Sequence, residues 1–302
     1  MRVSQRVRRG ITYGLAVSFV RLFNFLPRRA CLFISSWLGL LASRLLPRDR
    51  YKAMRHLALV YGDSLSIERR RTIVRHLYIN AARNIADVIR FRDHFSDEIR
   101  PLVTVEGLEH FQRAIERGKG LIGITGHIGN FELVAAWVAS SGFKTAVIGR
   151  RMYDERLDRL LLENRKETGI VNIATTDSPR VIVKWLKEGG ALGVLIDNDS
   201  MRVRGMHVPM FNRLANTPIG QSVLGLRTGA AFVPMACVRT GDNRYRLIIR
   251  PEVTIEPSGD QDRDVYQITL ACTREIERFI LEFPDQWIWF HNRWHTRPES
   301  AT

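Results

Sequence analysis

From Pro101 onward, short apolar runs alternate with longer segments of helical periodicity, and this alternation constrains the fold more than any other feature. Strands separated by helices pair in parallel, because each helical connection returns the chain to the same edge of the sheet. The sequence therefore predicts an α/β fold with a largely parallel sheet covered by helices. The expected strands are 102–105, 121–125, 145–148 and 191–196, and the expected helices are 108–117, 131–140, 154–168 and 178–187.

The pattern changes near the end of the chain. A helix is expected over 218–228 and another over 263–282, with strands 231–237 and 245–250 between them. The two strands are separated by a turn that contains Gly241-Asp242-Asn243, so they should pair antiparallel. We expect this pair at one edge of the sheet.

Positive charge is concentrated at the N-terminus. The chain of 302 residues has a formal net charge of +15, and its first 55 residues hold twelve Lys or Arg and one acidic residue, Asp49. These charges flank two apolar runs, 11–26 and 30–46, and do not form the basic stripe with interleaved aromatic residues that is typical of nucleic-acid binders. A bilayer is therefore the expected partner of residues 1–46, and nucleic acid is not.

The mode of membrane attachment has two interpretations. Each apolar run is shorter than the roughly 20 residues that cross a hydrocarbon core, and Arg21 interrupts the first. One interpretation is a tilted span whose basic start stays at the cytoplasmic face. The other is a helical hairpin that turns at Pro27 and lies in the headgroup layer. The residues of the basic start are Arg2, Arg6, Arg8 and Arg9.

The rest of the chain divides into a connector and a larger domain. Residues 47–100 are polar with helical periodicity, which predicts a helical connector, and residues 101–302 should form the α/β domain. Cys31, Cys237 and Cys272 are far apart in the sequence and form no CxxC pair. This usage indicates a reducing compartment and predicts no cysteine metal site.

The segment 118–132 carries the strongest chemical signal. The predicted strand 121–125 delivers His127 and, five residues later, Glu132 to the start of the helix 131–140, where Asn130 is the expected N-cap. In open α/β sheets ligands bind beyond the carboxyl ends of the strands. A histidine that accepts a proton needs its other ring nitrogen held by an acceptor, and Glu132 is the expected acceptor.

In these motifs the chain resembles the lysophospholipid acyltransferase superfamily, and specifically its branch of lipid A late acyltransferases, the lauroyl and myristoyl transferases. The resemblance extends from the basic apolar N-terminus to Pro298 and rests on six blocks in the same order. The first block is 126–132 (GHIGNFE); the second is Arg150 with Leu157, Asp158, Arg165 and Gly169; the third is 189–190 with 195–199 (LIDND). The fourth is 208–211 (VPMF) with Ala215, Thr217 and Pro218; the fifth is 228–230 with 233–234; and the sixth is 284–294 (PDQWIWFHNRW).

The resemblance implies a reaction as well as a fold. A fatty acyl group would move from an acyl thioester, on acyl carrier protein or on acyl-CoA, to a hydroxyl of a membrane lipid acceptor, a lipid A precursor. The reaction would take place at the cytoplasmic face of the cell inner membrane. His127 would be the general base and Glu132 its partner, with no acyl-enzyme, no cofactor and no metal. Glycine-rich amides near His127 could stabilise the oxyanion.

The expected substrate-binding residues follow from the same resemblance. Arg150 follows the strand 145–148, so it should stand at the same sheet rim as His127, where it could hold a phosphate or a sugar. Four more residues belong to this set: Gly129, Asn130, Arg165 and Asp197. For Arg165 an ordinary solvated helix charge is an alternative, since Glu163 and Glu167 are its neighbours.

Departures from the branch leave other functions open. Asn198 stands where the branch usually has glutamine, and His291-Asn292-Arg293-Trp294-His295 differs from the usual His-Arg-Arg-Trp-Lys. The acceptor could therefore be another glycolipid, a lysophospholipid or an ornithine lipid, or water in a thioesterase. A metal hydrolase using His291 and His295 on a helix is a further rival, as is a membrane scaffold without catalysis.

Overall fold

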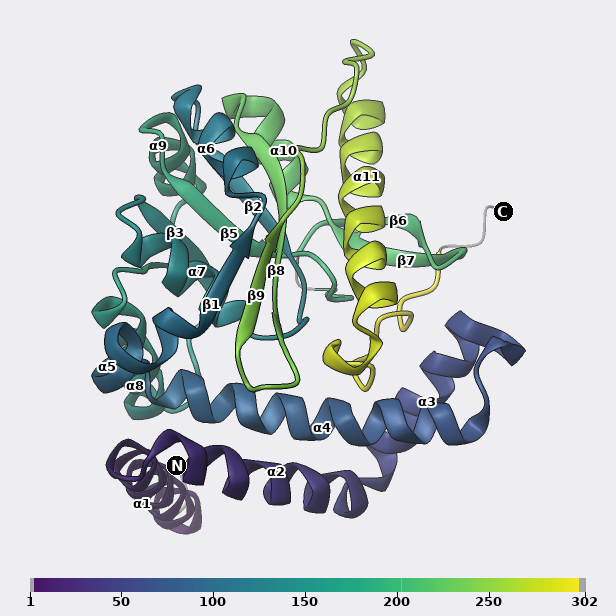
Figure 1. The fold of residues 1–302 in the computed structure, drawn as a ribbon. Coiled ribbons are helices and arrows are strands. Elements are labelled where there is room, and N and C mark those ends of the chain that lie inside the picture. The colour runs from purple at the N-terminus through teal and green to yellow at the C-terminus, as the bar shows by residue number, and fades with distance from the viewer. Residues whose placement is uncertain (1–2, 202, 299–302) are drawn as a thin grey trace.

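A seven-stranded sheet forms the centre of the protein (Figure 1). The computed structural model describes residues 3–201 and 203–298. The strand order is β1-β9-β8-β2-β5-β3-β4, and the only antiparallel pairing among these described strands is that of β8 with β9. The strands are β1 (Val103–Glu106), β2 (Leu121–Thr125), β3 (Thr145–Gly149), β4 (Val171–Ala174), β5 (Ala191–Leu195), β8 (Ala231–Arg239) and β9 (Tyr245–Ile249).

Helices cover both faces of this sheet and bury two hydrophobic clusters. One face packs against α9, α10 and α11, and the opposite face packs against α6 and α7. All five residues of β2 are buried, as expected for a central parallel strand covered on both faces. The helices after β1 are α6 (Leu108–Glu116), α7 (Phe131–Ser140), α8 (Glu155–Glu167), α9 (Pro179–Lys187), α10 (Gly220–Thr228) and α11 (Gln261–Glu282).

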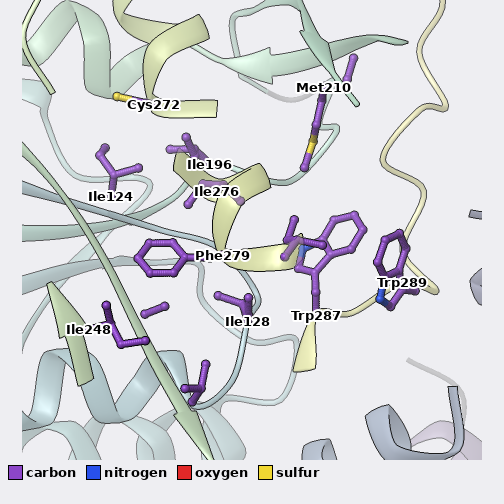
Figure 2. Close-up of a cluster of buried hydrophobic side chains, with 14 of the residues drawn as sticks. Ile124, Ile128, Ile196, Met210, Ile248, Cys272, Ile276, Phe279, Trp287 and Trp289 are labelled. Carbon is purple, nitrogen blue, oxygen red and sulfur yellow. The ribbon is translucent and has the colours of Figure 1, made fainter. Parts of the chain in front are cut away.

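The larger cluster lies between the sheet and the C-terminal helix α11. In Figure 2, Ile276 and Phe279 of α11 lie beside Ile124 of β2 and Ile248 of β9. The indole side chain of Trp287, fully buried just beyond α11, joins the same cluster. The burial of α11 thus brings the segment that follows it close to the carboxyl end of β2.

Four helices precede the sheet: α1 (Val3–Phe25), α2 (Arg28–Leu45), α3 (Pro47–Tyr61) and α4 (Ile67–Ile89), with short helical turns over 62–64 and 91–102. The chain breaks at Pro27, as the hairpin interpretation expected, because proline cannot continue a helix. α2 lies alongside α4 below the sheet in Figure 1. Gly39 permits this close packing, since a Cβ there would lie 2.5 Å from the Tyr78 carbonyl oxygen.

The predicted membrane anchor, residues 1–46, can be compared with these helices only by length and composition. Among residues 3–201 and 203–298, no single helix is both long and apolar enough to cross a bilayer. The bent pair Arg28–Leu45 and Pro47–Ser64, with an angle of 86°, meets the length and composition requirements together. Arg2, part of the predicted basic start, lies outside the described residues.

The predicted α/β alternation is confirmed, with β2 and α7 at the predicted residues. Three strands were not predicted: β4, and the separate antiparallel hairpin of β6 (Gly205–Met210) and β7 (Arg213–Pro218). The placement of the antiparallel pair was wrong. β9 is not an edge strand, because β1 pairs with it in parallel and forms the edge.

Candidate active site

The candidate site lies at the carboxyl ends of β2 and β5, which are neighbours in the sheet. His127 follows β2 by two residues, and Asp197 follows β5 by two residues. The pairing of the strands continues for one step beyond them, since the Ile196 amide donates to the Thr125 carbonyl at 3.1 Å. Two residues far apart in sequence are therefore placed side by side by the strand order alone.

His127 and Asp197 form a hydrogen-bonded pair. His127 Nδ1 lies 2.8 Å from Asp197 Oδ1, and the His127 backbone amide donates to Asp197 Oδ2 at 2.7 Å. The Asp197 carboxylate is fully buried, whereas 22% of the His127 side chain is exposed. An Nδ1 proton held by the carboxylate leaves Nε2 as the nitrogen with a free lone pair. This arrangement leaves Nε2 of the imidazole available to accept a proton.

Electrostatics favour the charged pair over two neutral groups. Burial lowers the pKa of His127, but the charge of Asp197 and its hydrogen bond raise it, and the net direction is upward. Burial raises the pKa of the Asp197 carboxyl, and the charge and hydrogen bond of His127 lower it further than burial raises it. Asp197 therefore stays ionised beside the imidazole, and its negative charge favours the protonated form of His127.

Residues 286–288 hold this pair in place. The Trp287 indole Nε1 donates to Asp197 Oδ2 at 2.8 Å, so the carboxylate has three described donors. The Gly129 amide donates to the Gln286 carbonyl at 2.8 Å, and the Ile288 amide donates to the His127 carbonyl at 3.2 Å. The loop that carries His127 is thereby fixed on two sides, by β5 and by the segment after α11.

A positive φ at position 129 allows the loop to turn so tightly. Gly129 has a φ of +57°, and a Cβ there would lie 2.0 Å from the carbonyl oxygen of Cys237. Its amide is already bonded to Gln286, and the Asn130 amide donates to the Cys237 carbonyl at 2.7 Å. The amides of Gly129 and Asn130 are consequently engaged in the fold and are not oxyanion donors, contrary to the expectation for glycine-rich amides.

The predicted role of Glu132 as the orienting acid of His127 is wrong. Its carboxylate faces Arg165 of α8, with Arg165 Nε 3.0 Å from Glu132 Oε2 and a second hydrogen bond from Nη2 to Oε1. The Arg165 side chain is 13% exposed and the Glu132 side chain is 15% exposed. Arg165 also donates to Asn172 Oδ1. In the first turn of α7 the Glu132 carboxylate is thus taken up by Arg165 of α8, and Asp197 is the carboxylate bonded to the imidazole.

The other predicted substrate-binding residues occupy different surroundings. Arg150 is exposed immediately after β3, on the same carboxyl edge as His127. Asn130 is buried, caps α7 through its bond from the Leu133 amide, and donates to the Tyr245 hydroxyl at 3.3 Å. Asp197 lies behind His127, so the expectation of direct substrate contact is corrected to a role in holding the base.

A second histidine lies near the first. The rings of His127 and His291 have centroids 6.0 Å apart, and His291 Nδ1 is 3.1 Å from Asn198 Oδ1. Burial lowers the pKa of His291 to about 4, so this imidazole is neutral at pH 7. The segment around it is irregular and not helical, which removes the helical His291–His295 pair assumed for a metal hydrolase. Within the described ranges no group of three or more His, Cys, Asp or Glu is arranged to hold a metal ion.

A narrow apolar cavity of about 50 Å³ runs beneath α7 from the Glu132–Arg165 pair. Its lining includes residues of β2 from Thr125 at the carboxyl end to Leu121 at the amino end. Its walls are mostly aliphatic side chains of α7, β3 and β5, with Phe111 at the far end. The lining is predominantly apolar, which favours contact with apolar groups.

Sequence comparison gives the site its family. Residues 2–296 match the family described as bacterial lipid A biosynthesis acyltransferases. The chain belongs to this family. It is therefore an acyltransferase, with His127 and Asp197 at the carboxyl edge of its sheet.

Three relatives indicate the range of the family. The Escherichia coli lipid A biosynthesis palmitoleoyltransferase is 26% identical over 291 residues, which cover 95% of this chain and 91% of the relative. The Escherichia coli lauroyltransferase is 26% identical over 293 residues, or 95% and 92% of the two chains. A phosphatidylinositol mannoside acyltransferase from Mycolicibacterium smegmatis is 25% identical over 191 residues, covering 62% of this acyltransferase and only 60% of the relative.

Proposed function

We propose that this acyltransferase moves a fatty acyl chain from an acyl thioester to a hydroxyl of a lipid A precursor, with His127 as general base and Asp197 as its orienting partner. The 2.8 Å contact between His127 Nδ1 and Asp197 Oδ1 carries the proposal. Nε2 removes the proton as the acceptor oxygen attacks the thioester carbonyl, the carbon–sulfur bond then breaks, and the imidazolium returns the proton to the departing thiolate. No acyl-enzyme forms.

The acyl chain is proposed to lie in the cavity under α7. Thr125, Phe131 and Glu132 line the cavity and belong to the segment that carries His127, so a chain with its thioester at this end would place it beside the imidazole. Acyl carrier protein and acyl-CoA are both compatible donors, since each ends in the same thioester. The first amides of α7, at Phe131 and Glu132, are proposed to stabilise the oxyanion, because a helix leaves its first amides without intrahelical partners.

The Glu132–Arg165 pair is proposed to form the polar rim of the cavity. Both side chains line the cavity at the carboxyl edge of the sheet. Carboxylate and guanidinium satisfy each other's charge there, so neither group needs a counter-charge from the apolar interior. Arg150, exposed on the same edge, is the proposed contact for a phosphate or a sugar of the acceptor.

The lipid A acceptor is supported by the two Escherichia coli relatives, whose names place them in lipid A biosynthesis and whose similarity covers more than nine-tenths of both chains. The mycobacterial relative acts on a phosphatidylinositol mannoside and supports another glycolipid as the alternative acceptor. Attachment through residues 1–46 at the cytoplasmic face of the inner membrane is part of the proposal. Apolar side chains exposed on α2 support it, among them Phe33, Trp37 and Leu45.

Replacement of the proposed base tests the function. His127→Ala should reduce acyl transfer to a lipid A precursor by at least about 10²-fold, the usual contribution of general base catalysis, and should leave binding to vesicles unchanged. His76→Ala, which removes a half-exposed imidazole of α4, is the matched control and should retain full activity. Mass spectrometry of the products separates transfer to lipid from release of free fatty acid. Unchanged transfer by the His127→Ala protein would refute the mechanism, and free fatty acid as the main product would favour a thioesterase.

A further inference from the structure

A groove of about 750 Å³ lies away from the His127 site, between α2, α4 and the turn that joins β8 to β9. Residues of α2, of α4 and of the β8–β9 turn line it, together with Leu102. The groove combines basic and apolar side chains. Its lining consists of Arg28, Arg29, Leu32, Phe33, Ser36, Trp37, Leu40, Ile79, Arg83, Leu102, Asp242, Asn243 and Arg244.

The charges that line the groove do not balance. Four arginines face one acidic side chain, Asp242, which lies 3.9 Å from Arg244. Arg28 already has a carboxylate partner, Asp87, at 2.7 Å behind the groove wall. In the part of the chain that the structure describes, neither Arg29 nor Arg83 forms an ion pair. The groove therefore has excess positive charge and can accept an anion.

Arg83 is held in position for such an anion. Its Nε donates to the Ser36 hydroxyl at 2.7 Å, which fixes the guanidinium between α4 and α2. Burial lowers the pKa of Arg83, and the nearby charge of Arg239 lowers it further, so the charged guanidinium is less stable here than in water. A phosphate placed against it would offset both effects, because arginine binds phosphate through parallel hydrogen bonds.

The apolar wall indicates what the anion is attached to. The Phe33 side chain is 66% exposed and the Trp37 side chain is 59% exposed, although both are aromatic residues on a helix that packs against the protein. Leu38 and Leu41 extend the same exposed surface along α2. A free phosphate would leave this apolar surface in water, whereas a lipid would cover it with acyl chains.

We propose that the groove between α2, α4 and the β8–β9 turn binds one anionic glycerophospholipid of the bilayer, with its phosphate at Arg83 and Arg29 and its acyl chains along Phe33 and Trp37. The inference rests on the membrane attachment proposed above and adds a specific headgroup site to it. The bound lipid is not the acyl acceptor. It fixes the orientation of α2 at the membrane surface through charge as well as through apolar burial.

Fluorescence quenching in micelles tests this site with the full chain. The protein in neutral detergent is titrated with dibrominated phosphatidylglycerol or with dibrominated phosphatidylcholine, and Trp37→Phe identifies the contribution of Trp37. We expect saturable quenching by phosphatidylglycerol and at least about tenfold weaker quenching by phosphatidylcholine. Arg83→Gln should weaken the apparent affinity for phosphatidylglycerol by about tenfold, since hydrogen bonds to charged groups are the strong ones. Arg29→Gln, an exposed position, gives a second variant in case Arg83→Gln destabilises the fold.

Controls separate this site from its alternatives. Arg213→Gln removes an exposed charge on β7 and should bind phosphatidylglycerol normally. Equal quenching by both lipids, or normal binding by both Arg83→Gln and Arg29→Gln, would overturn the site. Displacement by millimolar inorganic phosphate would identify a phosphate site without a lipid, and competition by an equimolar lipid A precursor would identify an acceptor site. Both results would also overturn the proposal.

Two further measurements distinguish failure of the proposed membrane attachment, or of the proposed reaction, from failure of the headgroup site. Flotation of the unmodified protein with neutral phosphatidylcholine vesicles reports attachment by apolar residues and does not depend on Arg83. Acyl transfer in micelles by the Arg83→Gln protein reports the reaction. A protein that floats and transfers acyl chains normally, but shows no preference for phosphatidylglycerol, would refute the headgroup site alone.

Discussion

Two buried carboxylates, Asp197 and Asp87, are alike in burial but differ in whether their partners can exchange protons. Both side chains are fully buried and accept several hydrogen bonds. Asp197 is bonded to an imidazole that is partly exposed and to the indole of Trp287. Asp87, on α4, is bonded to the guanidinium groups of Arg28 and Arg239 and to the Tyr245 hydroxyl.

The difference between them lies in the partners, because burial and ionisation are alike. The pKa of each carboxyl is lowered, since the nearby positive charges outweigh the effect of burial. A guanidinium does not release its proton near neutral pH, and burial holds the pKa of Tyr245 well above 10, so the Asp87 cluster cannot exchange protons. A buried carboxylate supports proton transfer when its partner titrates near neutral pH and reaches solvent.

Removal of the charge of Asp197 should have the largest effect on the reaction. Asp197→Asn keeps the shape of the side chain but no longer favours the Nδ1–H tautomer of His127, so kcat should fall about 10²- to 10⁴-fold. The thermal midpoint should change little in comparison, and steady-state kinetics with circular dichroism measures both. A loss of less than fivefold would show that His127 does not depend on this carboxylate.

Removal of Asp87 should act on stability and not on chemistry. Asp87→Ala leaves the buried Arg239 guanidinium without a carboxylate partner, so the free energy of unfolding should fall by about 3–5 kcal/mol. Denaturant unfolding measures this loss, and activity per folded molecule at low temperature should stay within a few-fold of the original. If kcat fell as far as in the Asp197→Asn protein, the two carboxylates would not be distinct.

The pair of Glu132 and Arg165 provides an intermediate case, because both groups are charged and slightly exposed. Glu132→Gln and Arg165→Met should each lower transfer, and the double variant should lose no more than the worse single variant. The expected coupling energy is about 0.5–3 kcal/mol. A double-mutant cycle on kcat/KM gives this value. Additive losses would mean that one of the groups contacts substrate independently of the other.

The pH dependence of the reaction should show the smallest effect. His127 accepts a proton only when neutral, and its pKa is raised above 6.5, so kcat/KM should fall as the pH decreases through that raised value. In Asp197→Asn the raising charge is lost while burial still lowers the pKa. The acidic limb of the profile should therefore move to lower pH by about one unit. The acidic limb of the pH profile of the Asp87→Ala protein should not move, and a shift of that limb would contradict the proposed difference between Asp197 and Asp87.

The sequence predicts the local parts of this site well. Residues 121–132 form strand, loop and helix within one continuous segment, so the apolar run, Gly129 and the Asn130 cap together are sufficient to predict them. His127 was found in this way. The prediction pairs Glu132 with it because the carboxylate is near in sequence, but in the fold that carboxylate is bonded to Arg165 of α8.

The partner of His127 could not be predicted from local pattern, because it depends on the order of the strands. Asp197 reaches the imidazole because β5 pairs with β2, and Trp287 reaches Asp197 because α11 packs on one face of the sheet. The position of Asp197 two residues after a strand was the available signal. The β6–β7 hairpin was missed for a different reason: its turn places Phe211 and Asn212 at positive φ, where Asn-Gly is the usual sequence.

The hydrogen bonds from residues 286–288 to the His127 loop have a consequence for biosynthesis. A ribosome that has released α1 and α2 still has nearly the whole sheet to translate, so those helices can contact the bilayer early. The indole that secures Asp197 leaves the exit tunnel only after α11. If residues 1–46 attach the chain as proposed, a nascent polypeptide can reach the membrane before it can turn over substrate, and a message truncated ahead of codon 286 should yield protein without enzymatic competence.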